Sequence, residues 1–257
     1  MIYTVISRTD LLSEYYKKND FKEGFFTEEI LKYISDTGNM KIRDERIAAY
    51  TSLFYSLNEL FSIRPKKILR TIYGKPYIQE GVYFSISHSN GLCAVTLSDK
   101  VEVGVDIQEF ISEKIGAGIN GRFLSGFEFY EEDFNINLLS LSESFDGGII
   151  LEPIFLDSSI SDEILVSQCS DENTSQNKKN PLDTKLLSSE NDPQYTSLYY
   201  TKKWTGAEAV TKLYGIGFGD LIKNKEAALN AFCDFKTVVL DEKYYLMANA
   251  LLKSDLK

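Results

Sequence analysis

Cysteine and histidine are scarce in this sequence, and the scarcity excludes some classes of protein. The three cysteines, at positions 93, 169 and 233, are an odd number at irregular spacing and form no CxxC pair. A disulfide framework or a zinc site needs paired cysteines at regular spacing, so neither is expected. A reducing cytoplasm fits this usage best. The only histidine is His88.

Basic residues and long apolar runs are also in short supply. The 257-residue chain has 28 Lys and Arg against 38 Asp and Glu, a net charge of -10, which repels nucleic acid and anionic membranes. No apolar run approaches the roughly 20 residues of a membrane span, and no basic segment with an apolar core opens the chain. We therefore expect an unexported cytoplasmic protein with no nucleic acid or membrane as partner, in which local cations hold any anionic ligand.

The patterns that are present indicate mixed α and β structure, with enough apolar residues for one large core or two modest ones. Apolar residues at three-to-four spacing predict a long amphipathic helix over residues 42–60. Alternation predicts short strands over 82–89, 92–98 and 101–107, and Asn90-Gly91 is a favoured hairpin turn between the first two. That turn pairs Ser89 with Leu92 and His88 with Cys93.

The two ends of the chain are also patterned, with a different composition between them. "IYTVIS" near the start is typical of a strand, Trp204, Glu208 and Lys212 share one helical face, and a closing hairpin turns at Asp241-Glu242. Residues 134–197 are rich in Ser, Asp, Asn and Glu towards their end and predict a mobile insertion.

His88 has three interpretations from the residues alone. It continues the strand face of Val82, Phe84 and Ile86, and most such histidines simply pack. Opposite Cys93 it could instead serve as the base of a cysteine hydrolase, although no third, orienting residue stands out. Alternatively it could bind phosphate through a ring N–H.

Carboxylates in two segments suggest a magnesium site. In "VGVDIQE", Asp106 and Gln108 alternate along a strand and present oxygens on one face. Mg²⁺ takes one or two protein carboxylates and completes its shell with water and phosphate, so Glu208 could supply the second carboxylate and Lys212 could meet the phosphate. Each segment alone is more simply a solvated strand end or an ordinary i,i+4 Glu-Lys pair.

Taken in order, six motifs resemble the 4'-phosphopantetheinyl transferases of the longer, Sfp-like class. They are "DERIAA", "YGKPYI", "FSISHS", "VGVDIQE", "RFLSGFE" and "KKWTGAEAVTKLYGIGF". The resemblance implies Mg²⁺-dependent transfer of 4'-phosphopantetheine from coenzyme A to a serine of an acyl or peptidyl carrier protein, with release of adenosine 3',5'-bisphosphate. It also implies a monomeric α/β (α+β) fold of two pseudo-symmetric halves, residues 1–104 and 105–257. Each half would be a small antiparallel sheet packed by a long helix, with coenzyme A held between the halves.

The same resemblance assigns roles to individual residues. The magnesium ligands it implies are Asp106, Gln108 and Glu208. The catalytic residues it implies are Glu128, which matches the general base for the incoming serine, and Lys212. The coenzyme A contacts it implies are Arg46, Lys75, Ser87, His88 and Lys212, the last of these beside the pyrophosphate.

Two departures from the family pattern stand out. The usual W-x-x-K-E-A reads W-T-G-A-E-A here, so Ala207 replaces a lysine and one cation near the phosphates is lost. Gln108 stands where an acid is common. Weaker binding of Mg²⁺ or coenzyme A is expected, and the alternative is a non-catalytic descendant that binds coenzyme A or a carrier protein.

Overall fold

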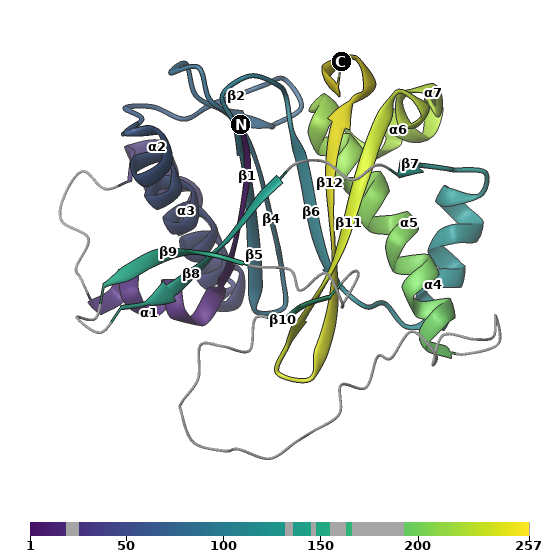
Figure 1. Cartoon of the computed structure of the whole chain (residues 1–257), viewed down its shortest axis with the longest axis horizontal. Coiled ribbons are helices and arrows are strands. Elements are labelled where there is room, and N and C mark those ends of the chain that lie inside the picture. Colours follow the sequence, from purple (N-terminus) through teal and green to yellow (C-terminus); the bar gives the residue numbers. More distant parts are fainter. Residues whose placement is uncertain (19–25, 132–135, 145–147, 155–162, 166–192, 257) are drawn as a thin grey trace.

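The chain folds into four layers, helix, sheet, sheet and helix, in a computed structural model that describes residues 1–18, 26–131, 136–144, 148–154, 163–165 and 193–256 (Figure 1). Helices α1 to α3 cover the outer side of the first sheet, and α4 and α5 cover the outer side of the second. Both sheets are mostly antiparallel, so the prediction of an α+β fold is confirmed.

The first sheet has the strand order β4-β5-β1-β8-β9. Its strands and the elements that precede or cover it are β1 (Ile2–Arg8), α1 (Thr9–Lys18), α2 (Glu28–Ser35), α3 (Met40–Phe61), β4 (Tyr83–Ser89), β5 (Leu92–Ser98), β8 (Ile136–Glu143) and β9 (Ile149–Pro153). A separate small hairpin pairs β2 (Leu69–Arg70) with β3 (Pro76–Tyr77). The register of β4 and β5 pairs Ser89 with Leu92 and His88 with Cys93, as the Asn90-Gly91 turn predicts.

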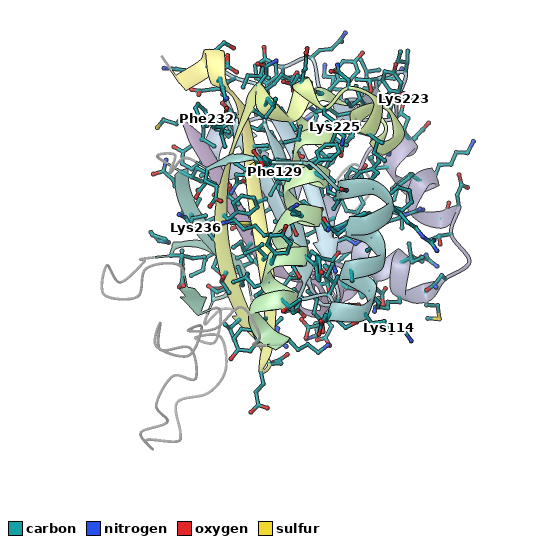
Figure 2. All side chains as sticks on the ribbon, turned by 90° about the vertical axis from the view of Figure 1, so that its right-hand side faces the viewer. Lys114, Phe129, Lys223, Lys225, Phe232 and Lys236 are labelled. Carbon is teal, nitrogen blue, oxygen red and sulfur yellow. The ribbon has the colours of Figure 1, made fainter. Side chains whose placement is uncertain are left out.

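The second sheet has the order β10-β11-β12-β6, with β7 also paired to β11. Its elements are β6 (Gly104–Glu109), α4 (Glu113–Ile119), the π-helical turn η1 (Asn120–Leu124), β7 (Tyr130–Glu131), β10 (Glu163–Leu165), α5 (Pro193–Tyr214), α6 (Phe218–Lys223), α7 (Glu226–Leu229), β11 (Ala231–Leu240), β12 (Lys243–Leu252) and the 3-10 turn η3 (Lys253–Leu256). In the side view of Figure 2, α5 crosses the sheet and Phe129 packs against this helix-sheet core.

The two halves share one topology. In each, an opening strand is followed by a 22-residue helix and then by a hairpin, and the opening strand pairs antiparallel with the second strand of that hairpin. The order β4-β5-β1 therefore repeats as β11-β12-β6. The predicted helix over 42–60 lies within α3, and the closing hairpin turns at Asp241-Glu242 as expected. The predicted strand over 101–107 instead begins at Gly104 and runs to Glu109.

The prediction of a mobile insertion over 134–197 is wrong for its first part. Residues 136–143 form β8, which pairs in parallel with β1, and β9 then pairs antiparallel with β8. Alternating apolar residues in "INLLSLSE" bury Leu138 and Leu141 on opposite faces, so the segment completes the first sheet despite its later position in the chain. Residues 155–162 and 166–192 lie outside the described part of the chain.

Side-chain hydroxyls join the two sheets. Ser85, Ser87 and Ser89 alternate along β4, and each Oγ accepts a hydrogen bond from a backbone N–H of β6, at 3.0, 3.2 and 3.2 Å. The edge of β6 is thereby satisfied by side chains in place of a neighbouring backbone. These bonds bring "FSISHS" and "VGVDIQE" together.

None of the described helices is long and apolar enough to cross a membrane.

Candidate functional site

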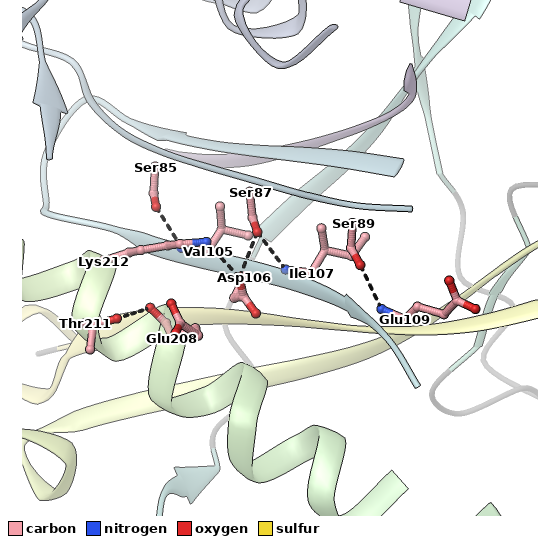
Figure 3. Close-up of polar contacts among 10 residues, drawn as sticks. All are labelled: Ser85, Ser87, Ser89, Val105, Asp106, Ile107, Glu109, Glu208, Thr211 and Lys212. Carbon is pink, nitrogen blue, oxygen red and sulfur yellow. Dashed lines mark hydrogen bonds and ion pairs between the residues drawn. The ribbon is translucent and has the colours of Figure 1, made fainter. Parts of the chain in front are cut away.

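Strand β6 and helix α5 approach each other very closely, and this approach places the predicted carboxylates together. Gly104 opens β6 directly against the helix backbone, where a Cβ would lie 2.1 Å from the carbonyl oxygen of Ala209 and 2.7 Å from the amide nitrogen of Leu213. Only glycine allows this contact. Asp106, two residues further along the same face of β6, therefore meets the side chains that α5 presents (Figure 3).

Asp106 lies at the centre of the cluster. The residue is 6% exposed, and its Oδ1 accepts hydrogen bonds from Ser87 Oγ and Lys212 Nζ, each at 2.7 Å. Ser87 comes from the first half and Lys212 from α5 in the second. One carboxylate oxygen thus joins three elements far apart in the sequence, while no described residue donates a hydrogen bond to the other oxygen.

Glu208 shares this site one helical turn before Lys212. Burial raises the pKa of Glu208 above its ordinary value, and the negative charge of Asp106 raises it further, while Lys212 opposes the shift. Two carboxylates that disfavour each other's charge in a partly buried site are well suited to a shared divalent cation. Glu208 and Lys212 are therefore more than an i,i+4 pair on an exposed helix face, because Lys212 forms an ion pair with Asp106.

The donor set fits magnesium and not a softer metal. The described residues include no group of three or more His, Cys, Asp or Glu side chains arranged for a metal. Two carboxylates with an amide oxygen suit Mg²⁺, which keeps several waters and shares substrate phosphates. Gln108 lies two residues from Asp106 on β6 and is partly buried. Its Nε2 donates to the backbone carbonyl of Glu109 at 3.1 Å, so its Oε1 is the atom able to act as ligand.

His88 projects from the helix side of β4 and not into a hydrophobic core. Its side chain is 36% exposed, and Nδ1 lies 3.3 Å from Oε2 of Glu45 on α3. Burial lowers the pKa of His88, Glu45 raises it, and the positive charges of Lys212 and Arg46 lower it. His88 therefore lies within electrostatic reach of Asp106, Lys212 and Arg46. Sequence patterns missed Glu45, since helix periodicity does not say which strand residue a helical side chain will face.

The cysteine hydrolase interpretation loses its nucleophile. Cys93 does lie opposite His88 in the strand register, but its side chain is fully buried. Burial raises the pKa of the Cys93 thiol to about 12, although Ser7 and Ser52 hydrogen-bond to it. A thiol that stays protonated and inaccessible is a packing residue.

Because His88 is the only histidine, its titration can be followed without assignment. We expect its pKa in the folded protein to lie below about 6.5, the value for an unperturbed imidazole. The unfolded chain then takes up the proton first as pH falls, so His88 contributes stability that is complete above about pH 6.5 and declines below it. An NMR titration of the imidazole checks this, and a midpoint above 6.5 would mean that Glu45 outweighs burial.

The cations expected to contact coenzyme A occupy two different settings. Lys75 lies in a turn, yet its side chain is only 13% exposed, and its Nζ donates to Oε2 of Glu102 at 2.6 Å and to the carbonyl of Leu213 at 3.0 Å. It fastens the β2–β3 hairpin to the end of α5. Arg46 remains partly exposed on α3 and donates to the backbone carbonyl of Tyr33 at 2.6 Å.

Two further positions differ from what the family pattern suggests. Glu128, the expected base, is exposed in the segment before β7, and no hydrogen bond or ion pair joins it to another described residue. The structure does not bring it into contact with Asp106. Ala207 is fully buried and belongs to the hydrophobic core of the second half. A lysine at 207 would have to leave that core before it could meet a phosphate.

Comparisons with known proteins do not add to this picture. No model of a known protein family matches the chain, and no curated protein matches its sequence.

A hollow of about 280 Å³ lies beyond the end of α5, lined by Tyr214, Ile216, Asn224, Glu226, Ala227 and Asn230. None of the residues predicted for the site lines it. The residue types around Asp106 are those that suit a divalent cation beside a phosphate.

Proposed function

We propose that the protein is a Mg²⁺-dependent 4'-phosphopantetheinyl transferase that modifies a serine of an acyl or peptidyl carrier protein. One observation carries the proposal: Ser87 and Lys212, from two separate motifs, donate hydrogen bonds to the Asp106 carboxylate of a third motif, and Glu208 lies close enough for Asp106 to raise its pKa. The six ordered motifs independently resemble that family. Both the residue types and their meeting place suit a pyrophosphate substrate held by one metal.

Each side chain of the site would have a separate role in phosphoryl transfer. Asp106 and Glu208 would hold Mg²⁺, with Gln108 as an amide ligand, and the bound metal supplies charge neutralisation at the pyrophosphate. Lys212 has 28% of its side chain exposed and can turn from Asp106 to a phosphate oxygen. Ser87 fixes the orientation of Asp106 through the hydrogen bond between Oγ and Oδ1. Such transfers depend mainly on positioning and electrostatics.

Deprotonation of the incoming serine is assigned to Glu128 by resemblance only. Its exposure leaves it accessible to a second protein, and a carboxylate can accept a proton when the hydroxyl is brought within hydrogen-bond distance. Because Glu128 does not contact the cluster, the docked carrier protein would have to bring the serine between them. A water held beside Asp106 is the alternative acceptor.

A transfer assay tests the proposal. The protein is incubated with coenzyme A, Mg²⁺ and a panel of apo acyl and peptidyl carrier proteins, and each carrier is weighed intact. We expect the mass of one phosphopantetheine on at least one carrier, and its disappearance when EDTA replaces Mg²⁺. No addition across a broad panel would contradict the proposal, and tight coenzyme A binding without transfer would support the non-catalytic alternative.

A further inference from the structure

Strand β6 meets the face of β4 and not its edge. Phe84 and Ile86 of β4 pack towards the helices of the first half, so the residues that alternate with them point towards β6. These residues are Ser85, Ser87 and Ser89, which we call the serine ladder. Their Oγ atoms accept hydrogen bonds, at 3.0, 3.2 and 3.2 Å, from the N–H groups of Val105, Ile107 and Glu109 (Figure 3).

Serine is the residue type that this contact requires. Val105 and Ile107 are 0% and 1% exposed, so an N–H group left there without an acceptor would be buried and costly. Alanine offers no acceptor, and a longer polar side chain would hold the strands further apart. A serine hydroxyl accepts the bond on the shortest possible side chain. The serine ladder therefore also determines how closely β4 and β6 approach each other.

The ladder surrounds Asp106. Its middle member, Ser87, bonds both the N–H of Ile107 and, at 2.7 Å, Oδ1 of Asp106. A single contact at Ser87 would leave β6 free to pivot about that point. Ser85 and Ser89 bond β6 on either side of it and remove this freedom. They thereby fix the direction in which the Asp106 carboxylate faces α5.

The corresponding edge in the other half is satisfied in a different way. In the repeated topology β1 takes the place of β6, and its edge pairs with the backbone of β8, from Ile2 with Ile136 to Ile6 with Ser140. The repeated topology itself therefore does not require a serine ladder. The ladder occurs at the edge that carries Asp106, which connects it with the site.

We propose that Ser85 and Ser89 are positioning residues for the divalent-cation site. They hold β6 at a fixed distance and direction from β4, and so keep Asp106 where it can share a cation with Glu208. They act through the strand of Asp106 and not as ligands. The inference rests on the proposed function for the presence of the metal. The three alternating serines of "FSISHS" are the sequence signal that could have drawn attention to it.

Binding of Mn²⁺ tests the inference without depending on transfer. Mn²⁺ takes the same oxygen ligands as Mg²⁺, and its free and bound forms differ in their electron paramagnetic resonance signal. The Mn²⁺ affinity is measured for the wild type, Ser89→Ala and the double variant Ser85→Ala/Ser89→Ala. Loss of the groups that orient a metal ligand typically weakens metal binding by about 10- to 100-fold, so we expect a loss of this size in the double variant. The single variant should lose less.

Two further variants separate positioning from a general loss of stability. Ser52→Ala removes a buried hydroxyl of the same half, which lies 3.1 Å from Ser7 Oγ in the core between α3 and β1. It should lower the urea midpoint but leave the Mn²⁺ affinity within about twofold of wild type. Ser89→Thr keeps the accepting hydroxyl at a partly exposed position and should bind Mn²⁺ as the wild type does.

The outcomes distinguish the inference from the proposed function. Wild-type Mn²⁺ affinity in the double variant, or an equal loss in Ser52→Ala, would overturn the inference, while transfer by the wild type could still occur. If Mn²⁺ binding depends on the ladder but no carrier protein is modified, the inference stands and the transferase proposal falls. If the double variant does not fold, Ser89→Ala and Ser89→Thr decide the case, since equal affinities of these two would contradict the positioning role.

Discussion

Asp106→Asn is expected to abolish transfer almost completely. The substitution keeps the shape of the side chain and removes the negative charge that would hold Mg²⁺, and a metal stabilises a phosphoryl-transfer transition state by several kcal/mol. We therefore expect kcat/KM to fall on the order of 10²- to 10³-fold or more. Any residual transfer should need a higher concentration of Mg²⁺, because an amide binds the metal more weakly than a carboxylate.

A matched variant separates this effect from a general loss of charge. Asp241→Asn changes the same residue type in an exposed hairpin turn, where a positive φ of 49° also suits asparagine. It should transfer at the wild-type rate. Equal activity of wild type and Asp106→Asn at limiting Mg²⁺ would show that Asp106 is not a metal ligand.

Gly104→Ala is expected to destabilise the whole second half and to separate the site residues. The new Cβ would overlap backbone atoms of α5, at 2.1 Å from the Ala209 carbonyl oxygen, and backbone cannot rotate away as a side chain can. The free-energy cost of such over-packing should lie at the upper end of its usual range, so we expect the free energy of unfolding to fall by at least about 3 kcal/mol. Urea unfolding measures it.

The control is another glycine of the same half. Gly118 lies in α4, and a methyl group added there would meet nothing within 4 Å, so Gly118→Ala should leave stability within about 1 kcal/mol of wild type or raise it. If the urea midpoint of Gly104→Ala equals that of the wild type, the backbone of α5 does not lie in close contact with Gly104 of β6. The placement of Glu208 and Lys212 beside Asp106 would then be wrong.

Local patterns were sufficient for much of the fold. The helix over residues 42–60, the Asn90-Gly91 hairpin and the closing hairpin all depend on periodicity and turn chemistry, which neighbouring residues determine. The role of residues 136–153 could not be found in this way. Their strands join the sheet of β1, more than a hundred residues earlier, and no local signal names a distant partner.

The site residues also divide into those that local patterns predict and those that only the tertiary structure reveals. Asp106, Gln108, Glu208 and Lys212 were predicted from residue type and motif order, and β6 and α5 do bring Asp106, Glu208 and Lys212 together. The hydrogen bond from Ser87 to Asp106 and the Glu45–His88 pair depend on tertiary packing, which local patterns do not encode. The sequence shows that Ala207 stands where the family pattern has a lysine, but only the packing shows that this side chain is buried.

The most direct test of the proposed function measures both products of one reaction. Wild-type protein, coenzyme A, Mg²⁺ and an apo carrier protein are mixed, and holo-carrier and released adenosine 3',5'-bisphosphate are quantified from the same sample with and without EDTA. We predict equal amounts of both products, dependent on Mg²⁺ and absent with Asp106→Asn. Coenzyme A that binds but yields neither product with any carrier would contradict the proposed function.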